Sequence, residues 1–331
     1  MTPTQLRAFS TVVRLGSVKE AAAELNVTEA AVSLHIGTLR KELGDRLFTR
    51  TSAGLAFTPG GLRLARRATE MLGLQDRTIR EVSQAGQGRR LLRIAASSLF
   101  AEHAAPGLIE LFTGRANDLD VEMIVCPSHQ FHSLLSSRAV DVAIGPDERG
   151  GPGPAASIHG AIGHPGGESL VARPFLNFRI VVVTAPEIAQ TLDAGADPAG
   201  QTWLLGPSAV GDDPVVPAVL AHFAVPEERQ RIFQSHAAAL EEAKRGNGLA
   251  LAVSFAVAGD VSSGRLVRIE AGGLRADGVW NAITLPGHGL LPAAAELTRF
   301  VVTPRAIQAM LRGSGVNVGH FRPSVHVTLW S

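Results

Sequence analysis

The sequence predicts two folded parts: an all-α winged helix-turn-helix N-terminal domain with a long linker helix, followed by a two-lobed α/β domain. Three observations predict this division. Within the first ninety residues, apolar side chains recur at helical spacing in three short segments and one long segment. Beyond them, short apolar runs alternate with helical segments, a pattern typical of a sheet covered by helices. The chain has 331 residues, 45% of them hydrophobic, so it is long enough for several cores.

Three short helices are expected at the start of the chain, each with a cap and a stop. Their expected limits are Thr2–Gly16, Ser17–Leu25 and Thr28–Gly44. Ser17 and Glu20 have the capping-box spacing, in which each side chain accepts a hydrogen bond from a free backbone N–H. Small residues let the second and third helices cross closely, and a tight turn joins them, so the pair predicts a helix-turn-helix. These small residues are Ala21, Ala22, Ala30 and Ala31.

A wing and a long helix are expected next. Residues 47–50 and 55–58 have the pattern of two strands, and the intervening segment Thr51–Gly54 predicts a glycine-containing turn. Thr58-Pro59 can cap and start a helix that runs from about residue 60 to residue 87. Its alternating three-and-four spacing predicts an imperfect coiled-coil seam. The seam residues are Leu62, Ala65, Thr69, Leu72, Asp76, Ile79 and Ser83.

The net charge changes sign along the chain. Residues 1–90 contain 14 Lys and Arg against 8 Asp and Glu, a net charge of +6, whereas the remaining residues carry −5. A basic head on an acidic body predicts an anionic partner for the head alone.

The single cysteine and the N-terminus bear on the compartment. Cys126 cannot form an internal disulfide, and we expect it to be a small buried hydrophobe rather than a redox switch. The first residues lack the layout of a secretion signal, and no apolar run is long enough to span a bilayer. The expected location is therefore the cytoplasm.

The body after residue 90 is expected to alternate strands with helices in two rounds, which predicts two lobes. We expect a parallel sheet with covering helices, because that arrangement buries strands on both faces. Strands are expected at residues 91–96, 121–125, 140–145, 178–184, 203–205, 248–255, 266–269 and 279–285. Helices are expected at 100–112, 131–138, from near Asp213-Pro214, 237–245 and 293–302.

Two further segments stand apart from this alternation. Residues 149–167 contain seven Gly and three Pro, which predicts a surface loop near the crossover between lobes. Residues 303–331 have a helical pattern at 304–311 and a strand-like pattern at 324–330. This C-terminal extension could add an edge strand or support oligomerisation, and the sequence favours neither.

A family resemblance is carried by the run from Gly16 to Ser33, GSVKEAAAELNVTEAAVS, and by the residues that follow it. These are Ile36, Leu39, Leu43-Gly44, Leu47-Phe48-Thr49-Arg50 and Thr58-Pro59-Gly60-Gly61. About twenty positions in this order, across three helices and a wing, resemble the signature of LysR-type transcriptional regulators. The resemblance implies a DNA-binding domain at 1–58, a linker and dimerisation helix at 59–88, and a periplasmic-binding-protein-like effector-binding domain at 91–302. Lobe one would then be about 91–165 with 272–302, and lobe two about 166–271.

The resemblance also implies which residues contact DNA. The start of the third helix would face base edges, and basic residues nearby would contact phosphates. Glu29 can accept a hydrogen bond from cytosine or can simply favour the helix dipole, and Leu34 can contact thymine methyl groups. The candidate DNA-binding residues are Ser17, Lys19, Thr28, Glu29, Ala30, Ser33, Leu34, Arg40, Lys41, Arg46, Arg50, Thr51 and Ser52.

Candidate effector-binding residues follow the expected strands of the body. Ligands of open α/β sheets bind beyond the carboxyl ends of strands, where helix N-termini offer free N–H groups. Ser97 and Ser98 can cap a helix, contact a ligand, or do both; His129 is either a solvated loop residue or a contact for an anionic effector. Asp213 is expected to be a helix cap, because carboxylates there would repel an anion. The candidates are Ser97, Ser98, Ser128, His129, Gln130, Phe131, Pro207, Ser208 and Val210.

The expected partners are double-stranded DNA with an interrupted inverted repeat near a promoter, a second copy of the chain, and an unknown small-molecule effector. The dimer would form through the linker helix and pair again into a homotetramer, and RNA polymerase is a further candidate partner. No cofactor and no metal site are expected. An enzyme, or a small-molecule-binding protein with an accessory DNA-binding head, is the alternative. The chain has no P-loop, GxSxG, GxGxxG or metal-ligand spacing to support catalysis.

Overall fold

The computed structural model describes residues 1–51, 54–85, 88–116, 118–146, 160–162, 170–210, 215–270, 276–286, 290–312 and 325–329. The chain forms two compact units, a head made mainly of Met1–Gln87 and a body made mainly of the residues from Gly88 onward. The predicted loop at 149–167, apart from 160–162, and Asp213 lie outside the described residues. No helix of the described residues is long and apolar enough to cross a membrane.

The head contains the predicted helices α1 (Pro3–Leu15), α2 (Val18–Glu24) and α3 (Glu29–Leu43). Their caps confirm the sequence signals: Thr2, Ser17 and Thr28 each accept a hydrogen bond from a backbone N–H three residues on. The full capping box occurs at Thr2 rather than at Ser17, because the Gln5 side chain also accepts a hydrogen bond from the Thr2 backbone N–H. The buried faces of the three helices form one core, in which Phe9, Val12 and Leu39 are fully covered.

The wing is an antiparallel pair of strands, β1 (Phe48–Thr51) and β2 (Gly54–Phe57), with Thr51 opposite Gly54. The head is therefore helical with a small sheet, and all-α is too narrow a description. Asp45 ties the wing to the start of α4 (Pro59–Ala85), because its Oδ1 accepts from the Leu47 N–H at 2.6 Å and the Thr58 hydroxyl at 2.7 Å. A side chain at Gly61 would place its Cβ 2.0 Å from the Leu47 oxygen, so only glycine fits.

The predicted seam of α4 overlaps the part of the helix that packs within the head. Ala65 and Leu72 pack against the head's own core together with the fully buried Ala68, because this stretch of α4 lies against α1. The exposed apolar residues of α4 include Leu62 and Ile79 of the predicted seam and three residues outside it. They are Leu62, Met71, Leu74, Ile79 and Val82.

The body is built on one curled, mixed sheet with the order β13-β4-β3-β5-β12-β7-β10-β8-β9, with β6 and β11 also paired to β7. The predicted parallel pairing is confirmed between β3 and its neighbours β4 and β5 and between β8 and β10. It is wrong for β12, which runs antiparallel to both β5 and β7, and for β10 against β7. In lobe one the strands are β3 (Arg90–Ala96), β4 (Leu119–Val125), β5 (Val142–Gly145), β6 (Gly160–Ile162), β12 (Asp277–Thr284) and β13 (Val325–Leu329). In lobe two they are β8 (Trp203–Leu205), β9 (Gln230–Ile232), β10 (Leu249–Val253) and β11 (Val267–Ile269).

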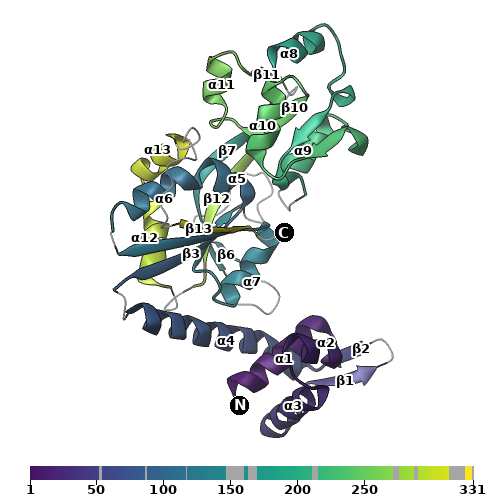
Figure 1. Ribbon diagram of the computed structural model, residues 1–331, viewed down its shortest axis with the longest axis vertical. Coiled ribbons are helices and arrows are strands. Elements are labelled where there is room, and N and C mark those ends of the chain that lie inside the picture. The colour runs from purple at the N-terminus through teal and green to yellow at the C-terminus, as the bar shows by residue number, and fades with distance from the viewer. Residues whose placement is uncertain are drawn as a thin grey trace. The chain divides into compact units, whose positions relative to one another are not determined.

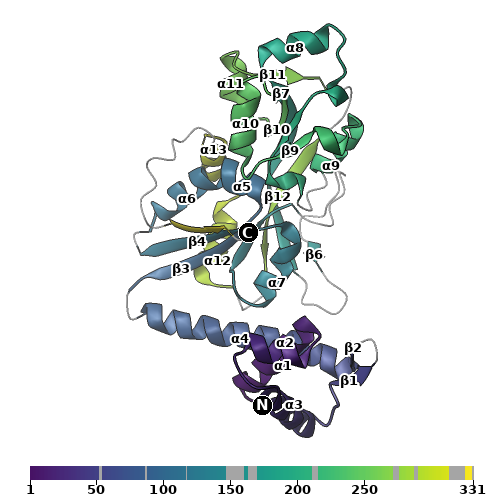
Figure 2. The same ribbon diagram turned by 45° about the vertical axis from the view of Figure 1, so that its right-hand side comes forward.

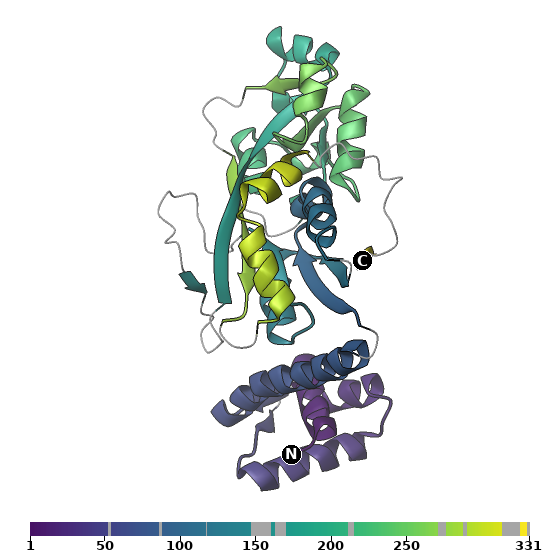
Figure 3. The same cartoon turned by 90° about the vertical axis from the view of Figure 1, so that its left-hand side faces the viewer.

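Strand β7 (Leu170–Thr184) connects the two lobes (Figure 1). Its residues from Val171 to Arg179 pair with β12, with one irregularity in the register, and Ile180 to Thr184 pair with β10 and β11. Figure 3 shows this long teal strand from the side as it passes from one lobe into the other. The sequence pattern predicted only its apolar second part, 178–184, because Ala172, Pro174 and Asn177 interrupt the earlier stretch.

Helices cover both faces of the sheet. In lobe one, α5 (Ser98–His103), α6 (Ala105–Thr113), α12 (Pro292–Phe300) and α13 (Pro304–Arg312) share one core with the sheet, and α7 (Phe131–Ser136) lies in the core of the other face. The helix predicted at 100–112 is divided after His103, because Pro106 in the first turn of α6 has no N–H to continue the helix. Lobe two has α8 (Pro186–Asp193), α9 (Val215–His222), α10 (His236–Lys244) and α11 (Ala258–Ser262).

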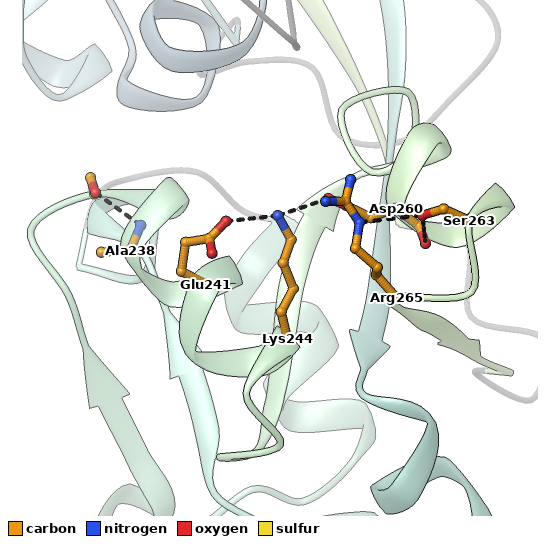
Figure 4. A network of polar contacts seen from close by, with 7 residues as sticks. Ala238, Glu241, Lys244, Asp260, Ser263 and Arg265 are labelled. Carbon is orange, nitrogen blue, oxygen red and sulfur yellow. Dashed lines mark hydrogen bonds and ion pairs between the residues drawn. The ribbon is translucent and has the colours of Figure 1, made fainter. Parts of the chain in front are cut away.

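An ion-pair network joins α10 to the end of α11 in lobe two (Figure 4). Lys244 Nζ lies 2.7 Å from Glu241 and 2.9 Å from Asp260, which in turn pairs with Arg265 at 2.6 Å. The two carboxylates stabilise the ammonium ion and raise the pKa of Lys244 against the opposing effect of its partial burial. The network fixes α11 against α10.

The C-terminal extension belongs to lobe one. Helix α13 packs against α6, and β13 pairs in parallel with β4 from Val325 opposite Val121 to Leu329 opposite Val125. Of the two alternatives left open by the sequence, the described residues therefore support the edge strand.

Candidate functional site

The first candidate surface is the exposed face of α3 and its approach. Val32, Ile36 and Leu39 bury the opposite face of the helix in the head's core. The five residues predicted at base edges are all exposed, and Leu34 is 69% accessible although it is large and apolar. They are Thr28, Glu29, Ala30, Ser33 and Leu34.

A hollow between α3 and the wing is rich in arginine. Ser33, Arg40, Arg46 and Arg50 line it together with Thr49 and the apolar residues Val18, Ile36 and Phe48. Arg46 and Arg50 are exposed, as are the predicted phosphate contacts Lys19 and Lys41. Cations from α3 and the wing therefore converge on one concave surface that suits a nucleic-acid backbone.

Arg40 has a structural role beside any contact with a phosphate. Its Nη2 donates to the Phe48 carbonyl oxygen at 2.8 Å, and its guanidinium lies 4.7 Å from the centre of the Phe48 ring. The bond ties α3 to β1. Thr51 likewise donates to the Gly54 carbonyl within the wing turn at 3.1 Å, and Ser17 caps α2; Ser52 lies outside the described residues.

Asp45 is the titratable anchor of this surface. The Leu47 N–H and, second, the Thr58 hydroxyl donate to its carboxylate and lower the pKa of Asp45 below its usual value. The wing is thus held by a carboxylate that is charged at neutral pH.

The second candidate surface lies where the two lobes of the body meet. Ser97 does not cap α5; its hydroxyl is buried and has no hydrogen-bond partner. Ser97 and Phe131 approach Gly145, since a Cβ at Gly145 would lie 2.7 Å from the Phe131 ring and 3.3 Å from the Ser97 Cβ. Ser128 and Phe131 are buried, whereas His129 and Gln130 are exposed. An unpartnered buried hydroxyl is a group that a polar ligand could satisfy.

Ser208 lies in a hydrogen-bonded chain that crosses between the lobes. Its Oγ is 2.8 Å from His236 Nε2, and His236 Nδ1 is 2.9 Å from Glu102 Oε1 on α5. The Glu102 carboxylate also accepts from the backbone N–H groups of His236 and Ala237, each at 3.1 Å. Lobe one therefore supplies the carboxylate that caps α10 of lobe two. Pro207 is half-buried and Val210 exposed beside Ser208.

His103 completes this cluster. Its ring centre lies 5.7 Å from that of His236, its side chain is buried, and its Nε2 has no hydrogen-bond partner. Burial and, to a smaller extent, the neighbouring His236 lower the pKa of His103 to about 4, so the ring is neutral at physiological pH. One atom each of Glu102, His103 and His236 lie within 4.8 Å of one another.

Sequence reasoning missed Glu102, His103 and His236. The rule that placed Ser208 near a cleft applies equally to the N-terminus of α10, which follows β9. Strand β9, Gln230–Ile232, is short, and two of its three residues are exposed. The sequence therefore has no apolar run here that would predict a strand.

Cys126 is buried in the second core of lobe one, as expected. Burial raises the pKa of its thiol to about 11, so the thiolate is scarce at neutral pH.

Two family profiles match the chain. Residues 3–62 match "Bacterial regulatory helix-turn-helix protein, lysR family", and residues 85–303 match "LysR substrate binding domain". An uncharacterised HTH-type transcriptional regulator of Mycobacterium tuberculosis is 56% identical over 333 residues, which span 100% of each chain. The RuBisCO operon transcriptional regulator of Allochromatium vinosum is 24% identical over 91% of this chain and 96% of its own.

Solved structures share the fold. The crystal structure of ArgP from Mycobacterium tuberculosis has a TM-score of 0.57 and 19% identity, covering 96% of this chain and 98% of that one. Full-length LysG from Corynebacterium glutamicum with bound effector Arg has a TM-score of 0.55 and 19% identity, covering 95% and 98%. At this identity the likeness concerns the fold alone.

Proposed function

Because the chain belongs to the LysR family of HTH-type transcriptional regulators, we propose that α3 and the wing bind a specific DNA sequence and that a small molecule between the lobes modulates this binding. The observation that carries the proposal is the exposed face of α3, where Leu34 and Ser33 lie beside the arginine-lined hollow. Base contacts from the helix and phosphate contacts from the hollow are the two components that specific binding needs.

The division of labour within this surface follows from its geometry. Arg50 and Arg46 would contact phosphates, because they are exposed at the wing side of the hollow. Arg40 would act mainly by holding the wing in place, because its guanidinium is already bonded to Phe48. Glu29 at the first turn of α3 would contact cytosine or favour the helix dipole.

A homodimer formed through α4 is consistent with the proposed DNA binding. Five apolar side chains of α4 remain exposed in one protomer although the helix already buries another face in the head. A second copy of the chain would cover them and place two recognition helices on an interrupted inverted repeat. Pairing of the bodies would extend the dimer to a tetramer, and RNA polymerase would meet the DNA-bound assembly.

The lobes support an effector role. The two-lobed, periplasmic-binding-protein-like body offers an unpartnered Ser97 hydroxyl in lobe one and the polar chain through Ser208 at the junction. A ligand there would change the arrangement of the lobes and, through the dimer, the spacing of the DNA-binding heads. The regulators named among the relatives are not enzymes, and we propose no catalytic role.

A fluorescence-anisotropy titration tests the proposal. The purified full-length protein is titrated with the intergenic DNA upstream of its own gene and with a scrambled control, at two salt concentrations. We expect the native fragment to bind at least about a hundredfold more tightly at the higher salt. Equal and strongly salt-weakened binding to both fragments would contradict sequence-specific recognition of this DNA.

Arg50→Ala sharpens that experiment. The variant should weaken binding to both fragments alike and reduce the dependence on salt by about one ion, because it removes one phosphate contact. Arg268→Ala is the matched control, since Arg268 is also exposed but lies in lobe two. A loss confined to the native fragment would mean that Arg50 contacts bases instead.

A further inference from the structure

The cluster at the lobe junction, Glu102, His103, Ser208 and His236, combines groups from both lobes. Glu102 and His103 lie at the end of α5 in lobe one, and His236 begins α10 in lobe two; Figures 1 and 2 show the two helices side by side. Glu102 and His236 are 134 residues apart in the sequence. His236 is 2% exposed and His103 6% exposed, whereas the Glu102 side chain retains 24% exposure. The cluster is buried but has one side open to solvent.

His103 is the unexplained member of this cluster. The other three side chains are hydrogen-bonded to one another, but His103 Nε2 is buried without a partner. A buried imidazole nitrogen usually finds a hydrogen bond, and one without a partner calls for an explanation such as an ion.

We propose that Glu102, His103 and His236 bind a divalent transition-metal ion of the zinc type and that this ion bridges the two lobes. Two imidazoles and one carboxylate suit Zn²⁺, and also Co²⁺ or Ni²⁺, better than Mg²⁺ or Ca²⁺, which prefer oxygen ligands alone. The three ligand atoms lie within 4.8 Å of one another. Zinc–ligand bonds are about 2.0–2.2 Å long, so the ligand atoms must come closer together around the ion. A change of side-chain rotamer is enough to bring the two most distant atoms into range.

The surroundings already orient two of the ligands. The N–H groups of His236 and Ala237 hold the Glu102 carboxylate, which leaves lone pairs of its oxygens for the ion. With the metal on Nδ1, His236 would carry its proton on Nε2 and donate it to Ser208 Oγ, now 2.8 Å away. Metal-bound histidines commonly donate their second ring N–H to such a partner, which fixes the tautomer. Ser208 is thus a positioning residue.

Two consequences follow from the position of the site. Three protein ligands leave a fourth coordination position for water or a small ligand, which can enter on the exposed side of Glu102. An ion held by both lobes favours the arrangement in which they touch here, because it binds that arrangement better than any other. Control of DNA binding by the ion rests on the function proposed above, but binding of the ion does not.

The test uses Co²⁺ as a spectroscopic probe on the full-length protein after treatment with EDTA. We expect one equivalent of Co²⁺ to give the visible absorption of a four-coordinate site and Zn²⁺ to abolish it. His103→Gln is the decisive variant, because it removes a ligand nitrogen without breaking a hydrogen bond at Nε2. It should weaken Co²⁺ binding at least about a hundredfold, and Ser208→Ala about tenfold.

Matched controls keep the outcome interpretable. His222→Gln changes an exposed histidine of α9 and should bind Co²⁺ as the parent protein does. Glu102→Gln should lose the absorption, and circular-dichroism melting in EDTA verifies that each variant folds. Absence of saturable Co²⁺ and Zn²⁺ binding at micromolar concentrations, or unchanged binding in His103→Gln, would overturn the proposal.

Anisotropy on the same preparations separates the two proposals. Specific DNA binding without metal binding would leave only the metal site refuted. Metal binding that His103→Gln abolishes, without specific DNA binding, would refute the function proposed above and support the site. A change in DNA affinity on adding Zn²⁺ that is absent in His103→Gln would support both.

Discussion

The DNA-facing surface of the head and the junction between the lobes are built in opposite ways. The head's candidate residues are exposed, and the caps that place them span only three residues along the chain. At the junction His103, Ser208 and His236 are buried and Glu102 is half-buried, and the hydrogen bonds between Glu102 and His236 join positions 134 residues apart. Substitutions on the exposed face of α3 should therefore change binding and leave stability intact, whereas substitutions at the junction should change both.

The largest effect on stability is expected from Glu102→Ala. The change removes three bonds from one carboxylate and leaves His236 Nδ1 and the backbone N–H groups of His236 and Ala237 without these partners. We expect the body to lose about 3 kcal/mol of stability, since a hydrogen bond to a charged group contributes roughly 1.5–3 kcal/mol. Urea unfolding in the presence of EDTA measures the loss.

Glu241→Ala is the control for Glu102→Ala. Glu241 lies on the same α10 but pairs with Lys244 at the surface, where its side chain is 59% exposed. Such pairs contribute about 1 kcal/mol or less. If the two variants were equally stable, the contact between the lobes would not stabilise the body. The contrast between the exposed surface of α3 and the junction would then be wrong.

Burial in the body can also be measured chemically at Cys126. Its pKa of about 11, against an ordinary value of 9.0 for a cysteine thiol, makes the thiolate about a hundredfold scarcer at pH 8 than in an unfolded chain. Because the pKa is raised, the fraction of reactive thiolate grows with pH up to about 11. We expect alkylation by iodoacetamide to be at least a hundredfold slower in the native protein than in urea, as followed by mass spectrometry. Rapid modification at pH 8 would show that this core opens.

The same contrast explains how far the sequence could predict the structure. Caps at Thr2, Ser17 and Thr28 and the glycine stops are local signals, so the helices of the head followed from them, whereas the DNA-facing role of Ser33 and Leu34 came from the family resemblance. The sheet of the body was predicted as parallel because alternation of strands and helices does not reveal direction. Strand β12 returns from lobe two and lies antiparallel between β5 and β7, a long-range pairing.

The junction was beyond prediction for a related reason. A histidine after a serine cap and a glutamate near the end of a short helix are ordinary on their own. Only the fold brings Glu102 onto the N-terminus of α10 and leaves His103 Nε2 without a partner. On α4, the apolar pattern could not distinguish a dimer seam from a face that packs within the head. Ala65 and Leu72 pack against the head's own core.

Ala21→Leu tests the close crossing of α2 and α3. Ala21 is fully buried in the core that α2 shares with α1 and α3, so we expect a larger side chain to disturb the packing of these helices at a cost of about 1–3 kcal/mol. We expect lower stability of the head and a marked loss of specific DNA binding, by differential melting and anisotropy. Ala23→Leu adds the same atoms to an exposed position of α2 and should change neither. Equal effects of both variants would mean that helix crossing does not position α3.

The smallest effect on stability is expected from Leu34→Ala. This variant also tests most directly the contrast between the exposed surface of α3 and the junction of the lobes. Leu34 is 69% exposed and contacts no core, so its removal should change the free energy of unfolding by less than about 0.5 kcal/mol. Affinity for the native DNA fragment should nevertheless fall about fivefold or more, because an apolar contact with a thymine methyl would be lost. Val267→Ala shortens an exposed apolar residue in lobe two and should leave affinity unchanged. If Leu34→Ala bound DNA as the parent protein does, the exposed leucine would have to serve a protein partner instead, and α3 would contact bases through its polar residues alone.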